Sequence, residues 1–188
     1  MKVLFILEII NVYNSLMKNK FKYIYLITFC MVCSVNAYTN ENYDSFQCYS
    51  TNSELSDSAY WAFSAIDSFD KKKYKEAIAI TDACFDIWAS QAVIMQKNFN
   101  KDNIKEPLTG NRFSKSEKKA IFSNWAINDV SVAIWAKARS LEELGKLELA
   151  KKSYSNCIFL THGRAWDNRG WFWAPSKDCA QRYLDLVK

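Results

Sequence analysis

The chain of 188 residues contains only four glycines and two prolines, and this scarcity restricts its fold more than any other feature. Antiparallel sandwiches and barrels need many tight turns, which are rich in glycine and proline. Phosphate-binding loops need several glycines close together, whereas the glycines here stand apart. The sequence therefore predicts an all-α protein with few connections, and it argues against nucleotide chemistry. A hydrophobic content of 49% is enough for one core.

The first 37 residues have the composition of an export signal. Three lysines within residues 18–22 precede an apolar stretch at residues 23–33, and a small-residue cleavage site, Val-Asn-Ala, follows at residues 35–37. This order is typical of a secretory signal peptide. We expect residues 1–37 to be a leader whose true start is Met17. No membrane-spanning segment is expected after processing, because neither apolar stretch of the leader reaches about 20 residues.

Export would place the remaining cysteines in an oxidising compartment. Four of them follow the leader: Cys48, Cys84, Cys157 and Cys179. They are scattered, without a C-x-x-C pair, so no zinc or other metal site is expected. We predict that neighbours in sequence pair, Cys48 with Cys84 and Cys157 with Cys179, because each bond would hold a terminal segment on the nearer pair of helices. The alternative is that the buried thiols are small core residues.

The mature chain divides into an arm and one helical domain. Residues 38–55 are polar and without a period, which indicates a surface arm, and residues 56–188 form the domain. Its first helix is expected to begin at Ser56, whose hydroxyl can accept a hydrogen bond from the opening turn. A second helix follows the lysine run at residues 71–73. The polar stretch at residues 98–112 is then the longest connection.

Signals for further helices lie in the second half of the chain. Residues 114–117 read S-x-x-E, the form of a capping box, so a helix is expected to start there. Asn128 and Asp129 offer a fresh cap for the next helix. Residues 147–160 form its partner after a glycine turn. Gly163 is expected to end that partner in the left-handed conformation.

An internal repeat relates the two pairs of helices. Residues 73–85 align with residues 146–158 at a constant offset of 73, with small residues in corresponding places. The positions that define the repeat are Ala65, Ala77 and Cys84 in the first copy and Ala138, Gly145, Ala150, Tyr154 and Cys157 in the second. The second copy resembles the tetratricopeptide repeat, in which small residues stand where paired helices cross closely. The first copy departs from that motif, because lysine replaces the turn glycine and Thr81 replaces the aromatic.

The tail carries the most distinctive block, W-D-x-R-G-W-F-W-x-P at residues 166–175, followed by an amphipathic helix. This block and the repeat together resemble a family of exported bacterial tetratricopeptide-repeat proteins over roughly residues 55–188. The resemblance implies tetratricopeptide-like helix hairpins, an aromatic capping segment, a terminal helix and a periplasmic or secreted location. The family's function is mostly undefined, and some members carry glucanase-type names.

Candidate catalytic residues have structural interpretations. His162 is the only histidine, and at a helix end it is expected to interact with the last carbonyls and the negative end of the dipole. Asp129 and Asp167 are the carboxylates that a glycoside hydrolase would use. Asp129 is better interpreted as charge at a helix N-terminus, and Asp167 as a turn residue that pairs with Arg169.

The leading hypothesis is a non-catalytic scaffold that binds a protein or peptide on its concave helix surface, including Trp135 and Arg139. The tail residues Trp166, Arg169, Trp171 and Trp173 are either part of a peptide- or glycan-binding surface or a plug that buries most of the rings. Alternatives are a glycan- or peptidoglycan-associated protein of glucanase type, and a subunit that oligomerises. The net charge of +2 after the leader is too weak for a nucleic-acid site. No cofactor is expected.

Overall fold

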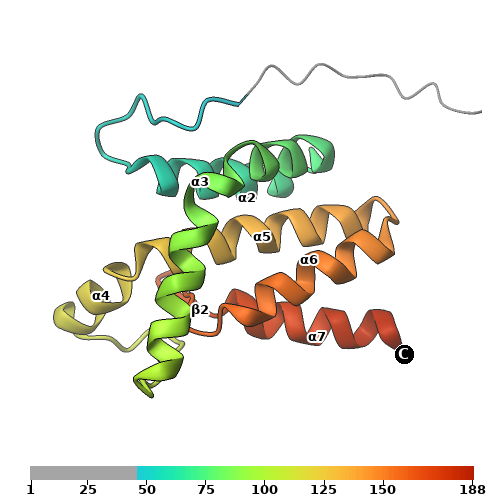
Figure 1. Cartoon of the computed structure of the whole chain (residues 1–188). Coiled ribbons are helices and arrows are strands. Elements are labelled where there is room, and N and C mark those ends of the chain that lie inside the picture. The colour runs from blue at the N-terminus through green and yellow to red at the C-terminus, as the bar shows by residue number, and fades with distance from the viewer. Residues whose placement is uncertain (1–45) are drawn as a thin grey trace, which may run out of the picture. The chain divides into compact units, whose positions relative to one another are not determined.

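The computed structural model describes residues 46–188. The predicted leader and residues 38–45 of the predicted arm lie outside the described residues. The described part is mostly helical, as predicted, and also contains a two-stranded hairpin that the sequence did not predict (Figure 1). Its elements, in order, are α2 (Asp57–Asp70), α3 (Tyr74–Lys101), α4 (Lys115–Phe122), α5 (Trp125–Glu143), α6 (Leu147–Phe159), β1 (Ala165–Asp167), β2 (Trp171–Trp173) and α7 (Pro175–Val187).

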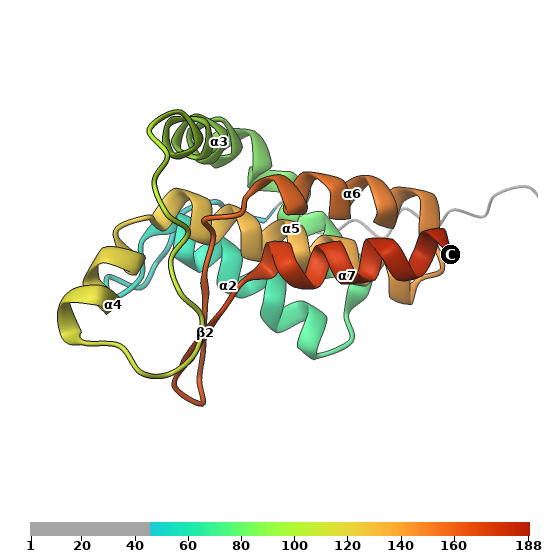
Figure 2. The same ribbon diagram turned by 90° about the horizontal axis from the view of Figure 1, so that it is seen from below.

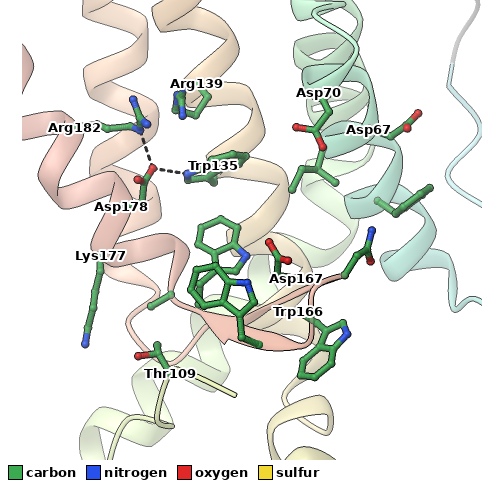
Figure 3. Close-up of a pocket in the computed structure, with 17 residues that line it drawn as sticks. Asp67, Asp70, Thr109, Trp135, Arg139, Trp166, Asp167, Lys177, Asp178 and Arg182 are labelled. Atoms are coloured by element: carbon green, nitrogen blue, oxygen red, sulfur yellow. Dashed lines mark hydrogen bonds and ion pairs between the residues drawn. The ribbon is translucent and has the colours of Figure 1, made fainter. Parts of the chain in front are cut away.

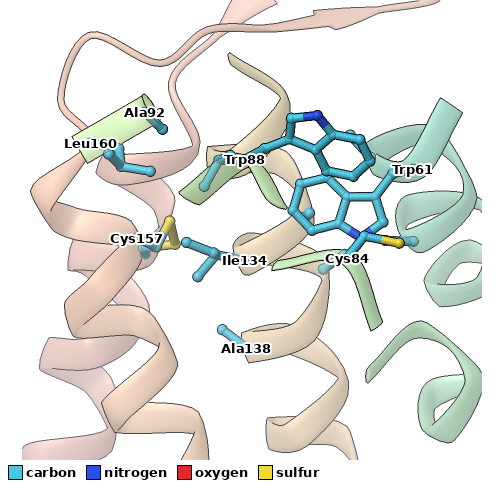
Figure 4. Close-up of a cluster of buried hydrophobic side chains, with 14 of the residues drawn as sticks. Trp61, Cys84, Trp88, Ala92, Ile134, Ala138, Cys157 and Leu160 are labelled. Carbon is cyan, nitrogen blue, oxygen red and sulfur yellow. A yellow bond between two sulfur atoms is a disulfide. The ribbon is translucent and has the colours of Figure 1, made fainter. Parts of the chain in front are cut away.

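Helix α5 lies at the centre of the fold. Helices α2 and α3 pack on each other and on α5, and α6 packs between α5 and α7 (Figure 1). Alanines and serines are buried along α5, and such small side chains let helices approach from several sides. Between α2 and α3 the ring of Trp61 lies 5.0 Å from that of Trp88 and is tilted against it by 36° (Figure 4). Its Nε1 donates to the carbonyl of Ile80 at 2.8 Å.

The turn between α2 and α3 has the same backbone geometry as the turn between α5 and α6. Lys72 and Gly145, 73 residues apart, both have a left-handed backbone, with φ of 59° and 69°. The N–H of Lys73 donates to Ser68 and that of Lys146 to Leu141, each at 2.9 Å. The repeat therefore persists in the backbone although lysine replaces glycine, at a strain cost of about 1 kcal/mol. Its small positions are all fully buried: Ala65, Ala77, Cys84, Ala138, Ala150 and Cys157.

Helix starts follow the capping signals in two cases and depart from them in a third. Ser114 and Glu117 form the predicted capping box, and Ser56 accepts from the N–H of Ala59 at 3.3 Å. Helix α5, however, begins at Trp125, so Asn128 and Asp129 lie inside its first turns rather than at its cap. That part of the prediction was wrong. Both side chains bond to other segments instead.

The role expected for Gly163 was also wrong. It does not belong to the residues with a left-handed backbone. A Cβ at this position would lie 2.4 Å from Oγ and 2.8 Å from Cβ of Ser131. Gly163 is therefore required because the chain after α6 crosses α5 at close range.

Both predicted disulfides are present. Cys48 joins Cys84, across a separation of 36 residues, and attaches the segment before α2 to α3. Cys157 joins Cys179, across 22 residues, and attaches α7 to α6. The bonded cysteines of α3 and α6 are the corresponding residues of the two repeat copies. Each pair of helices therefore holds a neighbouring segment through the same position of its second helix.

Helix α3 is the one element of residues 46–188 that is long and apolar enough to cross a membrane by length and composition. A third of its most apolar stretch is buried inside the fold. The helix packs on α2 and α5, which are the contacts of a helix within a folded core.

Candidate functional site

The tail block folds into the β1–β2 hairpin. Its loop of three residues ends at Gly170, whose φ of 96° suits glycine. Asp167 accepts from the N–H of Arg169 at 2.8 Å and from its Nε at 3.0 Å, and these bonds lower the pKa of Asp167 to about 2. The predicted pairing of Asp167 with Arg169 is confirmed. It fixes the turn that presents the tryptophans.

The two faces of the hairpin have different surroundings. Phe172 is fully buried and packs against Phe113 (5.2 Å), Phe122 (5.2 Å) and Trp166 (4.7 Å). Trp171 and Trp173 lie on the opposite face, because successive side chains alternate along a strand. The hairpin also bonds to the loop before α4 through Gly110, beside β2 (Figure 2).

We expected the tail block to plug the open end of the last pair of helices, but its buried face packs elsewhere. The buried face of the hairpin covers α4 and the preceding loop, whereas α7 packs on α6. The rings are also only partly buried: 37% of Trp166 and of Trp171 is exposed. The plug that was expected to bury most of the rings is therefore not what the structure shows, because Phe172 is the fully buried ring of the block.

The exposed face of the hairpin forms the floor of a groove of about 970 Å³, whose walls are α2, α5 and α7 (Figure 3). We call it the tryptophan groove. Its aromatic lining includes Phe63, Trp135, Trp166, Trp171 and Trp173, and its charged lining consists of Asp67, Asp70, Arg139, Asp167, Lys177, Asp178 and Arg182. Trp135 and Arg139, predicted on the concave helix surface, thus share one site with the tail tryptophans. Of the predicted binding residues, Arg169 does not line it, and its guanidinium lies 5.9 Å from the ring of Trp171.

Trp135 is held in a fixed orientation. Its Nε1 donates to Oδ2 of Asp178 on α7 at 2.6 Å. Its ring meets Trp173 edge-on at 5.1 Å and Phe69 at 5.3 Å, and the guanidinium of Arg139 lies 5.6 Å from it. A rigid aromatic surface loses little conformational entropy on binding, which favours ligand affinity.

A polar network closes one end of the groove wall. Glu142 lies 3.6 Å from both Arg139 and Arg182, and it accepts a hydrogen bond from the hydroxyl of Tyr154. Burial, followed by the bond to Glu142, raises the pKa of Tyr154. Arg182 also donates to Asp178 at 2.8 Å. These arginines are therefore already paired, and the repeat tyrosine connects α6 to the groove.

The two carboxylates considered for catalysis are not brought together. Asp167 lines the groove, whereas Asp129 lies outside the lining, where it accepts from the hydroxyl of Ser58 on α2 at 2.7 Å. Burial raises the pKa of Asp129 to about 6, and the bond from Ser58 offsets part of that rise. Asp129 therefore joins α5 to α2 rather than serving as charge at a helix end.

The raised pKa of Asp129 predicts that the protein becomes less stable as the pH rises from about 4 to 6. In this range the folded protein retains a proton that the unfolded chain, with an ordinary pKa of 3.8, has lost. Asp129→Asn, which keeps an acceptor for Ser58, should raise the free energy of unfolding at pH 7 by about 2 kcal/mol. Urea unfolding at pH 4, 6 and 7 measures this, and a variant as pH-dependent as the wild type would contradict it.

His162 and Arg164 hold the loop between α3 and α4. His162 contacts Gln96 of α3 through Nδ1 at 2.8 Å and the carbonyl of Ile104 in the loop through Nε2 at 2.9 Å. The expected interaction of His162 with the last carbonyls of its own helix was therefore wrong. Arg164, which sequence reasoning missed, is 2% exposed and donates from Nε to the carbonyl of Pro107 at 2.8 Å.

Residues 46–188 contain no group of three His, Cys, Asp or Glu side chains that could hold a metal ion. Comparison of the chain with protein-family models, with curated proteins and with solved structures found no match. The tryptophan groove is therefore interpreted from its own geometry and chemistry.

Proposed function

We propose that this protein is a non-catalytic, tetratricopeptide-like binding module that holds a peptide segment of a partner protein in the tryptophan groove. The observation that carries the proposal is that the concave helix residues Trp135 and Arg139 line one groove with Trp171 and Trp173. Exposed aromatic rings held by a rigid frame are characteristic anchors of peptide and protein ligands.

The order of the helices supports the tetratricopeptide-like interpretation. The groove is lined by α2 and α5, the first helices of the two pairs, and by α7, which follows the second pair. Helix-pair repeats use this succession to form a concave binding surface. The common turn at Lys72 and Gly145 agrees with a repeated unit. The two disulfides are consistent with an oxidising compartment, so we place the protein in the periplasm or outside the cell.

A glycan is the second candidate ligand, favoured by one observation. The partly exposed ring of Trp171 stands beside the Asp167–Arg169 pair. Flat rings next to hydrogen-bonding groups also suit sugars. Glycoside hydrolysis requires two carboxylates on opposite sides of the bound sugar. Of the two carboxylates that the sequence suggested for this role, only Asp167 lines the groove, so they cannot act there as a pair.

Trp171→Ala should weaken peptide binding strongly without destabilising the fold. Octapeptides that bind the oxidised wild-type protein are first selected from a random displayed library. Their affinities for the wild type and for each variant are then measured by tryptophan fluorescence. Loss of a central aromatic anchor is expected to weaken binding at least 30-fold. Trp125→Ala is the matched control, because Trp125 is also 37% exposed but lies outside the groove lining.

Equal binding by wild type and Trp171→Ala would contradict the groove as the site. Failure to enrich any peptide, together with cosedimentation of the wild type but not of Trp171→Ala with insoluble peptidoglycan or glucan, would favour the glycan candidate.

A further inference from the structure

The C-terminal turn of α2 carries two carboxylates in an electrostatically unfavourable place. Asp67 and Asp70 lie at the end of this helix, and its last turn contains no basic residue. The C-terminal end of a helix dipole is negative, so acidic side chains there destabilise the helix. Both aspartates line the tryptophan groove.

The two carboxylates differ in their partners. Asp67 forms an exposed ion pair with Lys71 at 2.7 Å. Asp70 has no hydrogen bond or ion pair to any of the described residues, and its carboxylate is on the side of α2 that faces α5 (Figure 3). Burial, and then the charge of Asp67, raise the pKa of Asp70. Asp70 therefore presents an exposed carboxylate without an ion-pair partner among the described residues at the groove wall.

The groove lining contains three cations, but two of them pair with other carboxylates and none forms an ion pair with Asp70. Arg139 pairs with Glu143 at 3.2 Å, and Arg182 with Asp178 at 2.8 Å. Lys177 extends away from the labelled tryptophans (Figure 3). The rings that line the groove add negative π-faces, which attract cations. A ligand that complements this groove therefore carries a positive charge and is otherwise apolar or extended.

The floor of the groove favours an extended main chain. The N–H and C=O of Phe172 both bond to Gly110, at 2.7 and 2.8 Å. Because main-chain groups alternate along an antiparallel strand, Trp171 and Trp173 pair with β1. The N–H and C=O of Trp166 then point away from β2, without a main-chain partner among the described residues. A ligand strand can bond to this edge.

We propose that the segment bound in the tryptophan groove is an extended peptide with a lysine or arginine side chain that pairs with Asp70 beside the tryptophan rings. This inference rests on the proposed function and specifies its partner. Asp70 is thus a specificity residue whose placement lowers the stability of the free protein.

The test uses the octapeptide library selected on the oxidised protein. Selected peptides are expected to be enriched in lysine or arginine at one position. Asp70→Asn should weaken their binding about 10-fold and raise the Tm by about 1–3 °C, since it removes an unpaired charge at a helix end. Asp86→Asn is the matched control, because Asp86 is exposed on α3 outside the groove lining and should change binding little.

The outcomes separate the two proposals. Selected peptides without a basic residue, or peptides that bind Asp70→Asn as tightly as the wild type, overturn the inference while peptide binding stands. A lower Tm for Asp70→Asn would show that the carboxylate has a structural role and would also overturn it. If no peptide is enriched over Trp171→Ala, both proposals fail.

Discussion

Removing both disulfides is expected to lower the free energy of unfolding by about 6 kcal/mol. Each bond closes a loop, of 36 residues for Cys48–Cys84 and 22 for Cys157–Cys179, and restricts the unfolded chain by an amount worth about 3–4 kcal/mol. Domains of this size have a total stability of about 5–15 kcal/mol. The reduced protein is therefore expected to be marginally stable or unfolded at 37 °C.

The two bonds should contribute unequally. Without Cys48–Cys84, the segment before α2 can detach while the helices stay packed. Among residues 46–56, which the structure describes, its other contacts are few, such as the stack of Phe46 on Tyr60 at 5.4 Å. Without Cys157–Cys179, α7 is released from α6. Helix α7 supplies the Asp178 carboxylate that orients Trp135, so the groove would lose one wall.

Two double variants test this prediction. Cys157→Ala/Cys179→Ala should lose about 3–4 kcal/mol in urea unfolding and also lose peptide binding. Cys48→Ala/Cys84→Ala should lose about 2–3 kcal/mol, because its segment can detach locally, and should keep binding. Alanine is used because a buried serine would leave a hydroxyl to be satisfied. A Cys157→Ala/Cys179→Ala protein with the wild-type midpoint would show that the bond does not stabilise the fold.

The repeat and the disulfide pairing were readable from the sequence because they depend on local signals. Small residues at a fixed offset mark where helices cross. Each of the two cysteines at corresponding positions of the copies has a further cysteine nearby in the sequence, and the disulfides join these neighbours. The left-handed backbone of Lys72 shows that the first copy has the same turn as the second, although lysine stands in the place of glycine. Local chemistry and repetition thus predicted the helices and their pairing.

The groove depended on relations that the sequence does not display. Trp135 and Trp173 are far apart in the chain, and their contact arises because the hairpin folds beneath α5. Asp70 gave no signal, because it is an exposed carboxylate at a helix end and nothing in the sequence shows that this end borders the groove. The hairpin itself was hidden because three-residue strands are too short to show a period.

Arg164 is the second residue whose replacement should have a large effect. Its side chain is 1% exposed, and its guanidinium donates to the carbonyls of Pro107, Thr161 and Gly163. Glu106 is 3.7 Å away. A planar group with five donors can satisfy several carbonyls at once, whereas a lysine cannot. Arg164 thereby fastens the loop between α3 and α4 to the turn after α6.

Arg164→Met should lower the free energy of unfolding by about 4 kcal/mol, because it leaves buried carbonyls without donors and Glu106 without its partner. Arg164→Lys should restore only a small part of this loss. Arg169→Met makes the same chemical change at a side chain that is 80% exposed, and it should cost less than about 1 kcal/mol, because only an exposed ion pair with Asp167 is lost. Urea unfolding of the three variants gives the comparison.

The loss of stability in Arg164→Met should be greatest in the loop between α3 and α4, which Arg164 holds. This local effect distinguishes the expected role of Arg164 from a general weakening of the core. The carbonyl of Ile104 would still bond to His162, and Gly110 to Phe172, but Pro107 between them would be released. Limited trypsin digestion should therefore cleave Arg164→Met first after Lys105 or Arg112, with the helices still intact. Because that loop supports the hairpin from beneath, the cleaved protein should also lose binding in the tryptophan groove. Cleavage at the same sites and rate in wild type and variant would refute this role of Arg164.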